Sequence, residues 1–103
     1  MDENPKFIAP IENKIYITEG NTKVSVLTAM DFNGNEIDSF VLSGIDENFF
    51  MIENKNLKFK NPVNFETQST YVVNVIAFDE LGNSETKPLA ITHDGKFFFK
   101  VQP

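Results

Sequence analysis

Oxygen-bearing side chains gather in short turns of this sequence, and the clearest group is Asp31-Phe32-Asn33-Gly34-Asn35. Asp79 ends a β-rich run, and Glu19 ends an earlier one. Aspartate, asparagine and glutamate supply the hard oxygen ligands that calcium prefers, and a turn can aim several of them at one point. These turns are therefore candidates for holding a divalent cation.

The same residue types have a structural interpretation that stays open beside the first. Asp, Asn and Gly are the ordinary residues of β-turns, where the side chains hydrogen-bond their own backbone. An EF-hand is excluded, because its loop needs a glutamate at the twelfth position and residue 42, counted from Asp31, is leucine.

Composition excludes several functional classes. Fifteen acidic residues against nine basic ones give a net charge of −6, so no basic stripe exists for nucleic acid. Apolar runs such as Phe97–Phe99 fall far short of the ~20 residues that cross a bilayer. The absence of cysteine and the single histidine, His93, remove disulfides, thiol nucleophiles and paired-histidine metal sites. These features disfavour an enzyme.

The elements that must position these turns are β-strands. A chain of 103 residues makes one domain, and its apolar residues alternate with a period of two. The run 70–78 is apolar on both faces, which predicts a central strand. Together with the other runs it gives about seven strands and predicts two packed antiparallel sheets. The expected runs are 14–18, 23–29, 36–42, 49–52, 56–60, 70–78 and one or two between 87 and 101.

The C-terminal part leaves two alternatives open. Asp94-Gly95 is either a two-residue hairpin turn or a bulge inside one long last strand, and the role of Phe97–Phe99 depends on which.

The order of these features resembles a bacterial cadherin-like repeat over nearly the whole chain. In the first half the resemblance rests on an acidic segment that precedes the first predicted strand, on a predicted strand that ends at Glu19, and on the loop that begins at Asp31. In the second half it rests on an "F-x-I … G-x-L" pair, a "D-F-E" element and a "Y-x-V-x-V-x-A-x-D" strand. The matching residues are Asp2-Glu3-Asn4-Pro5-Lys6-Phe7, Ile15, Ile17, Glu19, Val24, Val26, Ala29, Phe50-Met51-Ile52, Leu57-Lys58-Phe59, Asn64-Phe65-Glu66, Tyr71, Val73, Val75, Ala77 and Asp79.

This resemblance implies an all-β, seven-stranded Greek-key β-sandwich of the cadherin/immunoglobulin-like kind, with calcium ions at the junctions between repeats. It implies a linker over 1–5 and one module over 6–103. Asp31, Asn33, Asn35 and Asp79 would lie at the N-terminal end, facing Asp2 and Asn4 of the linker. Glu19, Asn64, Glu66 and Asp94 would lie at the opposite end.

The sequence departs from the family pattern at both ends. Asn33, Asn35 and Asn64 stand where the family often has aspartate, which lowers the ligand charge and weakens calcium binding. After Asp94 the chain continues Gly95-Lys96-Phe97 in place of an acidic linker, so the C-terminal junction lacks half of its expected ligands.

The resulting prediction is a structural spacer or adhesion module within a larger bacterial surface or secreted protein. It would be extracellular or at the cell surface, with the signal peptide outside these residues, since Asp2 and Glu3 follow Met1 directly. Its partners would be adjacent repeats of the same chain and a protein or glycan adhesion partner, without membrane insertion.

Two other functional classes compete with this one. A carbohydrate- or protein-binding accessory module of a secreted enzyme is the alternative, although tryptophan is absent and Phe32, Phe49 and Phe78 are expected to be packed. Catalysis would need paired carboxylates such as Glu66 and Asp79, which the family resemblance puts at opposite ends.

Overall fold

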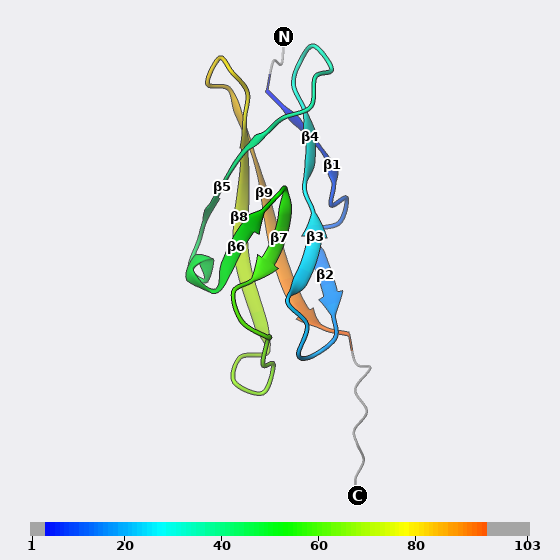
Figure 1. The fold of residues 1–103 in the computed structure, drawn as a ribbon, viewed down its shortest axis with the longest axis vertical. Coiled ribbons are helices and arrows are strands. Elements are labelled where there is room, and N and C mark those ends of the chain that lie inside the picture. Colours follow the sequence, from blue (N-terminus) through cyan, green and yellow to red (C-terminus); the bar gives the residue numbers. More distant parts are fainter. Residues whose placement is uncertain (1–3, 95–103) are drawn as a thin grey trace, which may run out of the picture.

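The computed structural model describes residues 4–94 of the chain (Figure 1). Within this range the chain forms strands and one 3-10 turn, and it contains no α-helix. The elements are β1 (Lys6–Ala9), β2 (Lys14–Ile17), β3 (Lys23–Val26), β4 (Thr28–Met30), β5 (Ser39–Ser43), η1 (Glu47–Phe49), β6 (Phe50–Glu53), β7 (Asn56–Phe59), β8 (Thr70–Phe78) and β9 (Ser84–His93).

The strands form two layers. One layer is a four-stranded sheet in the order β2-β9-β8-β5, in which β2 and β9 are parallel and the other pairs antiparallel. The other layer joins a three-stranded sheet, β3-β7-β6, to the β1-β4 pair, because β3 and β4 follow one another with only Leu27 between them. The predicted β-sandwich and the central position of 70–78 are confirmed.

The nine strand segments reduce to the seven strands expected from the sequence. The predicted run 23–29 is divided at Leu27, whose backbone N–H donates to the carbonyl of Lys55 (2.7 Å). The first strand is divided as well, since β1 pairs with β4 while β2 pairs with β9 in the other layer. The sequence did not predict β1 as a strand, because so short an edge segment has little alternation of its own.

Two further boundaries differ from the expected runs. The run 36–42 begins pairing with β8 only at Ser39, and Glu36 forms a single bridge with Met30 instead. The last strand begins at Ser84, three residues earlier than expected, because β8 and β9 stay in register up to their connecting loop. The alternatives at Asp94-Gly95, and the Phe97–Phe99 run, lie outside the described residues.

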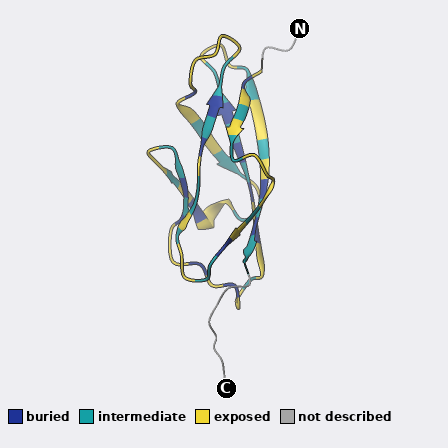
Figure 2. Ribbon diagram, turned by 90° about the vertical axis from the view of Figure 1, so that its right-hand side faces the viewer, coloured by how far each residue is buried: buried dark blue, intermediate teal, exposed yellow. Residues whose placement is uncertain are grey.

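The core lies between the layers and has two parts. The larger part is built on the fully buried residues Leu27, Leu57, Val73, Val75 and Ile91, with buried Phe59 stacked edge-on to Tyr71 (ring centroids 5.1 Å apart). The smaller part contains Ala29, Ile37 and Ala77. Ala29 and Ala77 each lie two residues before an aspartate that opens a loop, so this small cluster supports both loops from below. The connecting loops at both ends are largely exposed (Figure 2).

No helix among residues 4–94 is long and apolar enough to cross a membrane. The predicted division between a linker over 1–5 and a module over 6–103 stays a prediction.

Candidate functional site: two acidic loops at one end of the sandwich

The loop of residues 31–35 is organised by its first side chain. The backbone N–H groups of Asn33 and Asn35 donate to Oδ1 of Asp31, at 2.9 and 2.8 Å. The backbone N–H of Asp31 donates to the carbonyl of Asn35 (2.8 Å), which closes the loop. Gly34 has a φ of 86°, a left-handed conformation that glycine adopts without steric cost. No hydrogen bond to Oδ2 of Asp31 occurs among the described residues.

The loop of residues 79–83 repeats this arrangement. Both loops read Asp-x-x-Gly-Asn, and Gly82 has a φ of 89°. The backbone N–H groups of Leu81 and Asn83 donate to Oδ1 of Asp79, at 2.9 and 2.8 Å. The side-chain amide of Asn83 also donates to Oδ2 of Asp79 (3.0 Å). Both oxygens of Asp79 are therefore engaged within its own loop.

These hydrogen bonds decide the charge state of Asp79. Partial desolvation by itself raises the pKa of this carboxyl, but hydrogen bonds from the side chain and backbone of Asn83, and from the backbone of Leu81 and Gly82, outweigh it. The net effect lowers the pKa of Asp79 below its ordinary value, because each donor stabilises the ionised form. Asp79 is a fixed negative charge at neutral pH.

A pocket of about 630 Å³ lies between the two loops. Asp31, Asn33, Asn35 and Asp79 all line it, so the structure brings Asp79 to the loop 31–35, from which it is far apart in sequence. Further carboxylates from Glu36, Asp38 and Glu80 line the same pocket, as do the apolar side chains Phe32, Phe78 and Leu81. The pocket is strongly acidic and has an apolar rim.

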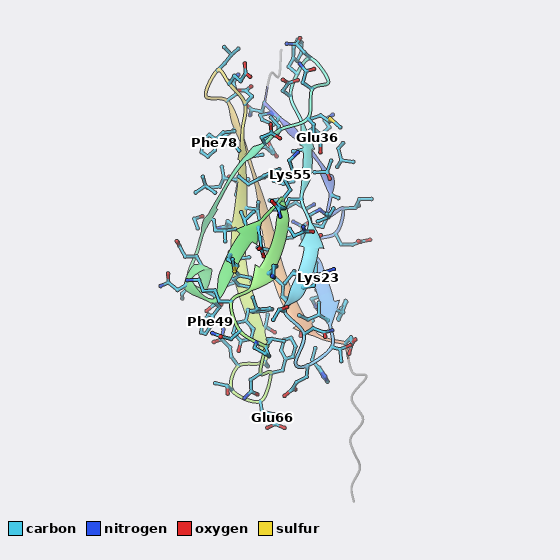
Figure 3. All side chains as sticks on the ribbon, viewed as in Figure 1. Lys23, Glu36, Phe49, Lys55, Glu66 and Phe78 are labelled. Carbon is cyan, nitrogen blue, oxygen red and sulfur yellow. The ribbon has the colours of Figure 1, made fainter. Side chains whose placement is uncertain are left out.

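A lysine from the turn between two strands of the other sheet, β6 and β7, offsets part of this charge. Lys55, in the turn between β6 and β7, contacts the carboxylates of Asp38 (Nζ···Oδ1 2.8 Å) and Glu36 (Nζ···Oε2 3.3 Å). The hydrogen bond to Asp38 is the largest cause that raises the pKa of Lys55, and it outweighs desolvation. Glu36 and Lys55 lie close together on the side of the molecule that carries β6 and β7 (Figure 3). Within residues 4–94, no lysine forms an ion pair with Asp31, Asp79 or Glu80.

The strand β1 begins beside this pocket. Lys6, its first residue, pairs with Met30, the residue immediately before Asp31. A segment preceding β1 therefore approaches the molecule at the end that carries the two loops. Asn4 is exposed and lies in this approach, whereas Asp2 lies outside the described residues.

The remaining predicted residues lie at the other end of the sandwich. Glu66 is seen there in Figure 3, at the opposite end from Phe78, which precedes Asp79. The backbone N–H of Glu66 donates to Oδ1 of Asn64 (2.9 Å), and the hydroxyl of Tyr71 donates to the backbone carbonyl of Asn64 (3.0 Å). Glu66 and Asp79 are thus too far apart to act as a catalytic pair on one substrate.

Glu19 belongs to the same end. The turn that follows it is tied to the segment before Asn64, since the N–H of Gly20 donates to the carbonyl of Val63 (3.0 Å). Burial first, and then the charges of Asp46 and Glu19, raise the pKa of the Tyr71 hydroxyl. Asp94 joins this end as well, because its Oδ2 accepts a hydrogen bond from the Thr18 hydroxyl (2.7 Å).

The donor chemistry of the pocket between the loops fits a hard divalent cation in part. Asp31 keeps Oδ2 for a ligand, and Asp79 Oδ2 accepts a single hydrogen bond, which leaves one of its lone pairs. Calcium takes six to eight oxygens, however, and no group of three or more acidic, histidine or cysteine residues within 4–94 is arranged to hold a metal. The remaining ligands would have to come from a linker or a neighbouring module.

Sequence reasoning missed part of this site. Four residues that line the pocket or support it were not predicted as site residues from the sequence: Glu36, Asp38, Glu80 and Asn83. The repeated Asp-x-x-Gly-Asn spacing is a readable signal for the second loop. Phe32, expected to be packed, is 54% exposed at the pocket rim, and Phe49 is 47% exposed.

Comparisons with known proteins were made for both the sequence and the fold. No protein-family model matches the sequence, and no curated protein matches it. The fold matches the crystal structure of human protocadherin-24 EC1-2 with a TM-score of 0.73 over 91% of this chain, at 20% identity. A second crystal form of that protein gives 0.73 over 90% of this chain, at 19% identity. This chain spans 44% and 45% of those chains, less than half of their length.

At this level of identity the likeness establishes the fold. The chain is a cadherin-like β-sandwich domain.

Proposed function

We propose that this chain is one extracellular repeat of a larger bacterial surface or secreted protein and acts as a structural spacer or adhesion module. The cadherin-like fold supports an adhesion or spacer role in general. No catalytic constellation is proposed, because the candidate carboxylates Glu66 and Asp79 lie at opposite ends. The partners are adjacent repeats of the same chain and a protein or glycan on another surface.

The observation that carries this proposal is the position of the acidic pocket relative to the strand ends. β1 begins beside the pocket, while β9 ends at the other end of the sandwich, where the N–H of Asp94 donates to the carbonyl of Ile17 (3.0 Å). A chain that enters at one end and leaves at the other suits modules strung in a line (Figure 1). The pocket would then face the module that precedes this one.

In this proposal calcium binds at the junctions. Asp31, Asn33, Asn35 and Asp79, with Asp2 and Asn4 from the linker, would hold it at the N-terminal end. Glu19 and Glu66 would contribute at the C-terminal end. When bound, a divalent ion cross-links the two modules and offsets the repulsion among their carboxylates. Because asparagine stands at two of these positions, we expect weak affinity, in the range of about 10⁻⁴–10⁻³ M typical of extracellular modules.

A calcium chloride titration of the 103-residue chain and of a tandem of two copies tests the proposal. We expect the amide NMR signals of Asp31, Asn33, Asn35 and Asp79 to move together, the melting temperature to rise, and both effects to be larger in the tandem. Asp31→Asn keeps an oxygen acceptor in the loop but removes a charge, so it should weaken binding several-fold. Glu53→Gln, on the outside of β6, is the matched control and should leave the titration unchanged.

Two outcomes would overturn the calcium proposal. One is the absence of any shift in the tandem at about 10 mM calcium, ten times the weak limit for extracellular modules. The other is an equal loss of binding in Asp31→Asn and Glu53→Gln, because it would show a non-specific response to net charge.

The accessory-module alternative has little support from the arrangement of aromatic side chains. Tyr16 is 58% exposed and Phe32 is 54% exposed, but Tyr16 pairs with Thr92 far from the loop that carries Phe32. They do not form one platform for a sugar chain. Binding of the chain to a glycan array, lost on replacement of either residue by alanine, would favour this alternative.

A further inference from the structure

Asparagine is common in this chain, but only one asparagine precedes a glycine. It is Asn33, in the dipeptide Asn33-Gly34 of loop 31–35. Asparagine is a thermally labile residue in proteins. Before glycine it is least stable, because glycine has no Cβ to obstruct attack by its backbone nitrogen on the asparagine side chain. The loop therefore contains a dipeptide at which the chain can modify itself.

The surroundings of Asn33 leave this reaction open to solvent. Asn33 and Gly34 are both exposed, and a Cβ built on Gly34 would meet no heavy atom within 4 Å. Within residues 4–94, no hydrogen bond engages the side-chain amide of Asn33, whose backbone N–H donates to Asp31. The side chain is therefore free to turn toward the nitrogen of Gly34, and water can reach the product.

The matching loop 79–83 has no such site. Leu81 stands at the position of Asn33, and the asparagine of that loop, Asn83, precedes Ser84. The side-chain amide of Asn83 donates to Oδ2 of Asp79 (3.0 Å), and Ser84 is the first residue of β9. Asn83 is thus held by its own loop and by the strand that follows it. Of the two loops, only 31–35 combines a following glycine with an unengaged side-chain amide.

From these observations we propose that Asn33 is a site of spontaneous deamidation, which adds a negative charge to the pocket between the two loops. The backbone nitrogen of Gly34 forms a bond to Cγ of Asn33 and gives up its proton. The bond from Cγ to Nδ2 breaks, and the amino group leaves with that proton as ammonia. Water then opens the resulting five-membered succinimide. Cleavage of the new N–Cγ bond leaves aspartate at position 33, and cleavage of the original peptide bond leaves isoaspartate.

The folded loop restrains the first step. The backbone N–H of Gly34 donates to the carbonyl of Asp31 (3.0 Å), and Oδ1 of Asp31 accepts from the N–H groups of Asn33 and Asn35. The nitrogen of Gly34 must leave its hydrogen bond before it can attack, so the loop has to open. Deamidation is therefore slower in the folded chain than in the unfolded chain, and its rate follows the local opening of loop 31–35.

The added carboxylate changes a pocket that is already acidic. Asn33 lines this pocket together with Asp31 and Asp79, and each event makes the net charge of −6 more negative by one unit. The consequence for calcium rests on the proposed function. Aspartate at position 33 supplies a charged oxygen ligand in place of a neutral one, which raises calcium affinity. Isoaspartate instead lengthens the backbone and disrupts the hydrogen bonds of the loop, so the two products have opposite effects.

Mass spectrometry of the 103-residue chain, incubated in EDTA, tests the modification without calcium. In a mildly alkaline buffer the mass should rise by the difference between a hydroxyl and an amino group. The rise should be slower in a mildly acidic buffer, because attack needs the deprotonated nitrogen, and faster in urea, because the loop is then open. Peptide mapping should place the change at Asn33. A protease that cuts before aspartate but not before isoaspartate separates the two products.

Three variants locate the site and explain its rate. Asn33→Gln should abolish the change, because glutamine would have to form a larger ring. Asn35→Gln is the matched control in the same loop and should deamidate like the parent. Asp31→Ala removes the acceptor that holds the loop and should speed deamidation about fivefold, the factor that corresponds to one net hydrogen bond. Circular dichroism confirms that each variant is folded during the incubation.

The calcium titration of Asn33→Asp isolates the aspartate product. This variant should bind calcium several-fold more tightly than the parent, and an affinity no higher than that of the parent would overturn the consequence for calcium. If the parent and the variant both bind no calcium, the calcium proposal fails together with this consequence, and the mass measurement still decides the modification.

Two results would overturn the modification site itself. One is an unchanged mass in the folded chain over a time in which the chain in urea deamidates at Asn33. The other is an equal rate of mass change in the parent and Asn33→Gln, because the reaction would then occur elsewhere. An equal rate in the parent and Asp31→Ala would overturn the restraint that we assign to the loop.

Discussion

The loops 31–35 and 79–83 share the same five-residue pattern and lie side by side at one end of the sandwich, yet they connect different kinds of strand pairs. Loop 79–83 connects β8 and β9, which stay in register from Phe78↔Ser84 to Thr70↔Thr92. Loop 31–35 follows β4 and leads across to β5 in the other layer, with one isolated bridge, Met30↔Glu36, beside it. One loop closes a long hairpin and the other begins a crossover between layers.

The difference shows how one local motif supports two roles. In loop 79–83 both oxygens of Asp79 accept hydrogen bonds from the loop, and the hairpin below it is continuous. In loop 31–35 only Oδ1 of Asp31 does so within the described residues. We therefore expect Asp79 to contribute more to stability, and Asp31 to contribute more to cation binding.

The largest effect should come from the two glycines that make the loops alike. Gly34→Ala and Gly82→Ala each force a side chain into a left-handed conformation, which costs about 1–2 kcal/mol. No heavy atom lies within 4 Å of either added Cβ, so the cost is conformational in both loops and should be equal. Urea unfolding measures it, with Glu80→Ala as the control in the same region. A clear inequality would show that the loops differ in backbone strain.

Alanine at the two aspartates should separate the loops. Asp79→Ala removes the acceptor for two backbone N–H groups and for the Asn83 amide, whereas Asp31→Ala removes the acceptor for two backbone N–H groups alone. We expect both variants to melt below the parent and Asp79→Ala to melt a few degrees below Asp31→Ala. Differential scanning calorimetry without calcium is the measurement. A lower melting temperature for Asp31→Ala would reverse the assignment of roles.

A smaller effect should appear in the dependence of stability on pH. The folded-state pKa of Asp79 is lowered below its ordinary value of 3.8, which the unfolded chain retains. The unfolded state therefore binds more protons in this range, and the stabilisation is present above about pH 4 and lost as pH falls through the folded-state pKa. Asp79→Asn should show a shallower loss of stability between about pH 5 and pH 2.5. Glu53→Gln is the control, and parallel curves for Asp79→Asn and the parent would contradict the prediction.

The sequence predicted the fold well where strands are long and buried. The run 70–78 alternates clearly and was placed at the correct residues in the centre of a sheet. It predicted poorly where a strand is short and pairs at an edge. β1 was missed, and the break at Leu27 was not foreseen, because both depend on which layer a segment meets and not on its own pattern.

The candidate site was predictable in its acidic turns but not in its surroundings. Asp31 and Asp79 were identified from their places after strands, and the family resemblance put them at the same end. The approach of Lys55 to Glu36 and Asp38 joins residues that are far apart along the chain, and no local spacing indicates it. The exposure of Phe32 is likewise set by the direction in which its loop leaves β4.

What the sequence by itself determined is the class of the protein: alternating apolar runs and Asp-Asn-Gly turns specify strands and the loops that join them, because both signals act over a few residues. What only the tertiary structure decided is which faces and loops meet. The shared pocket of two distant loops arises from strand register and layer packing, which bring together side chains that have no relation along the chain.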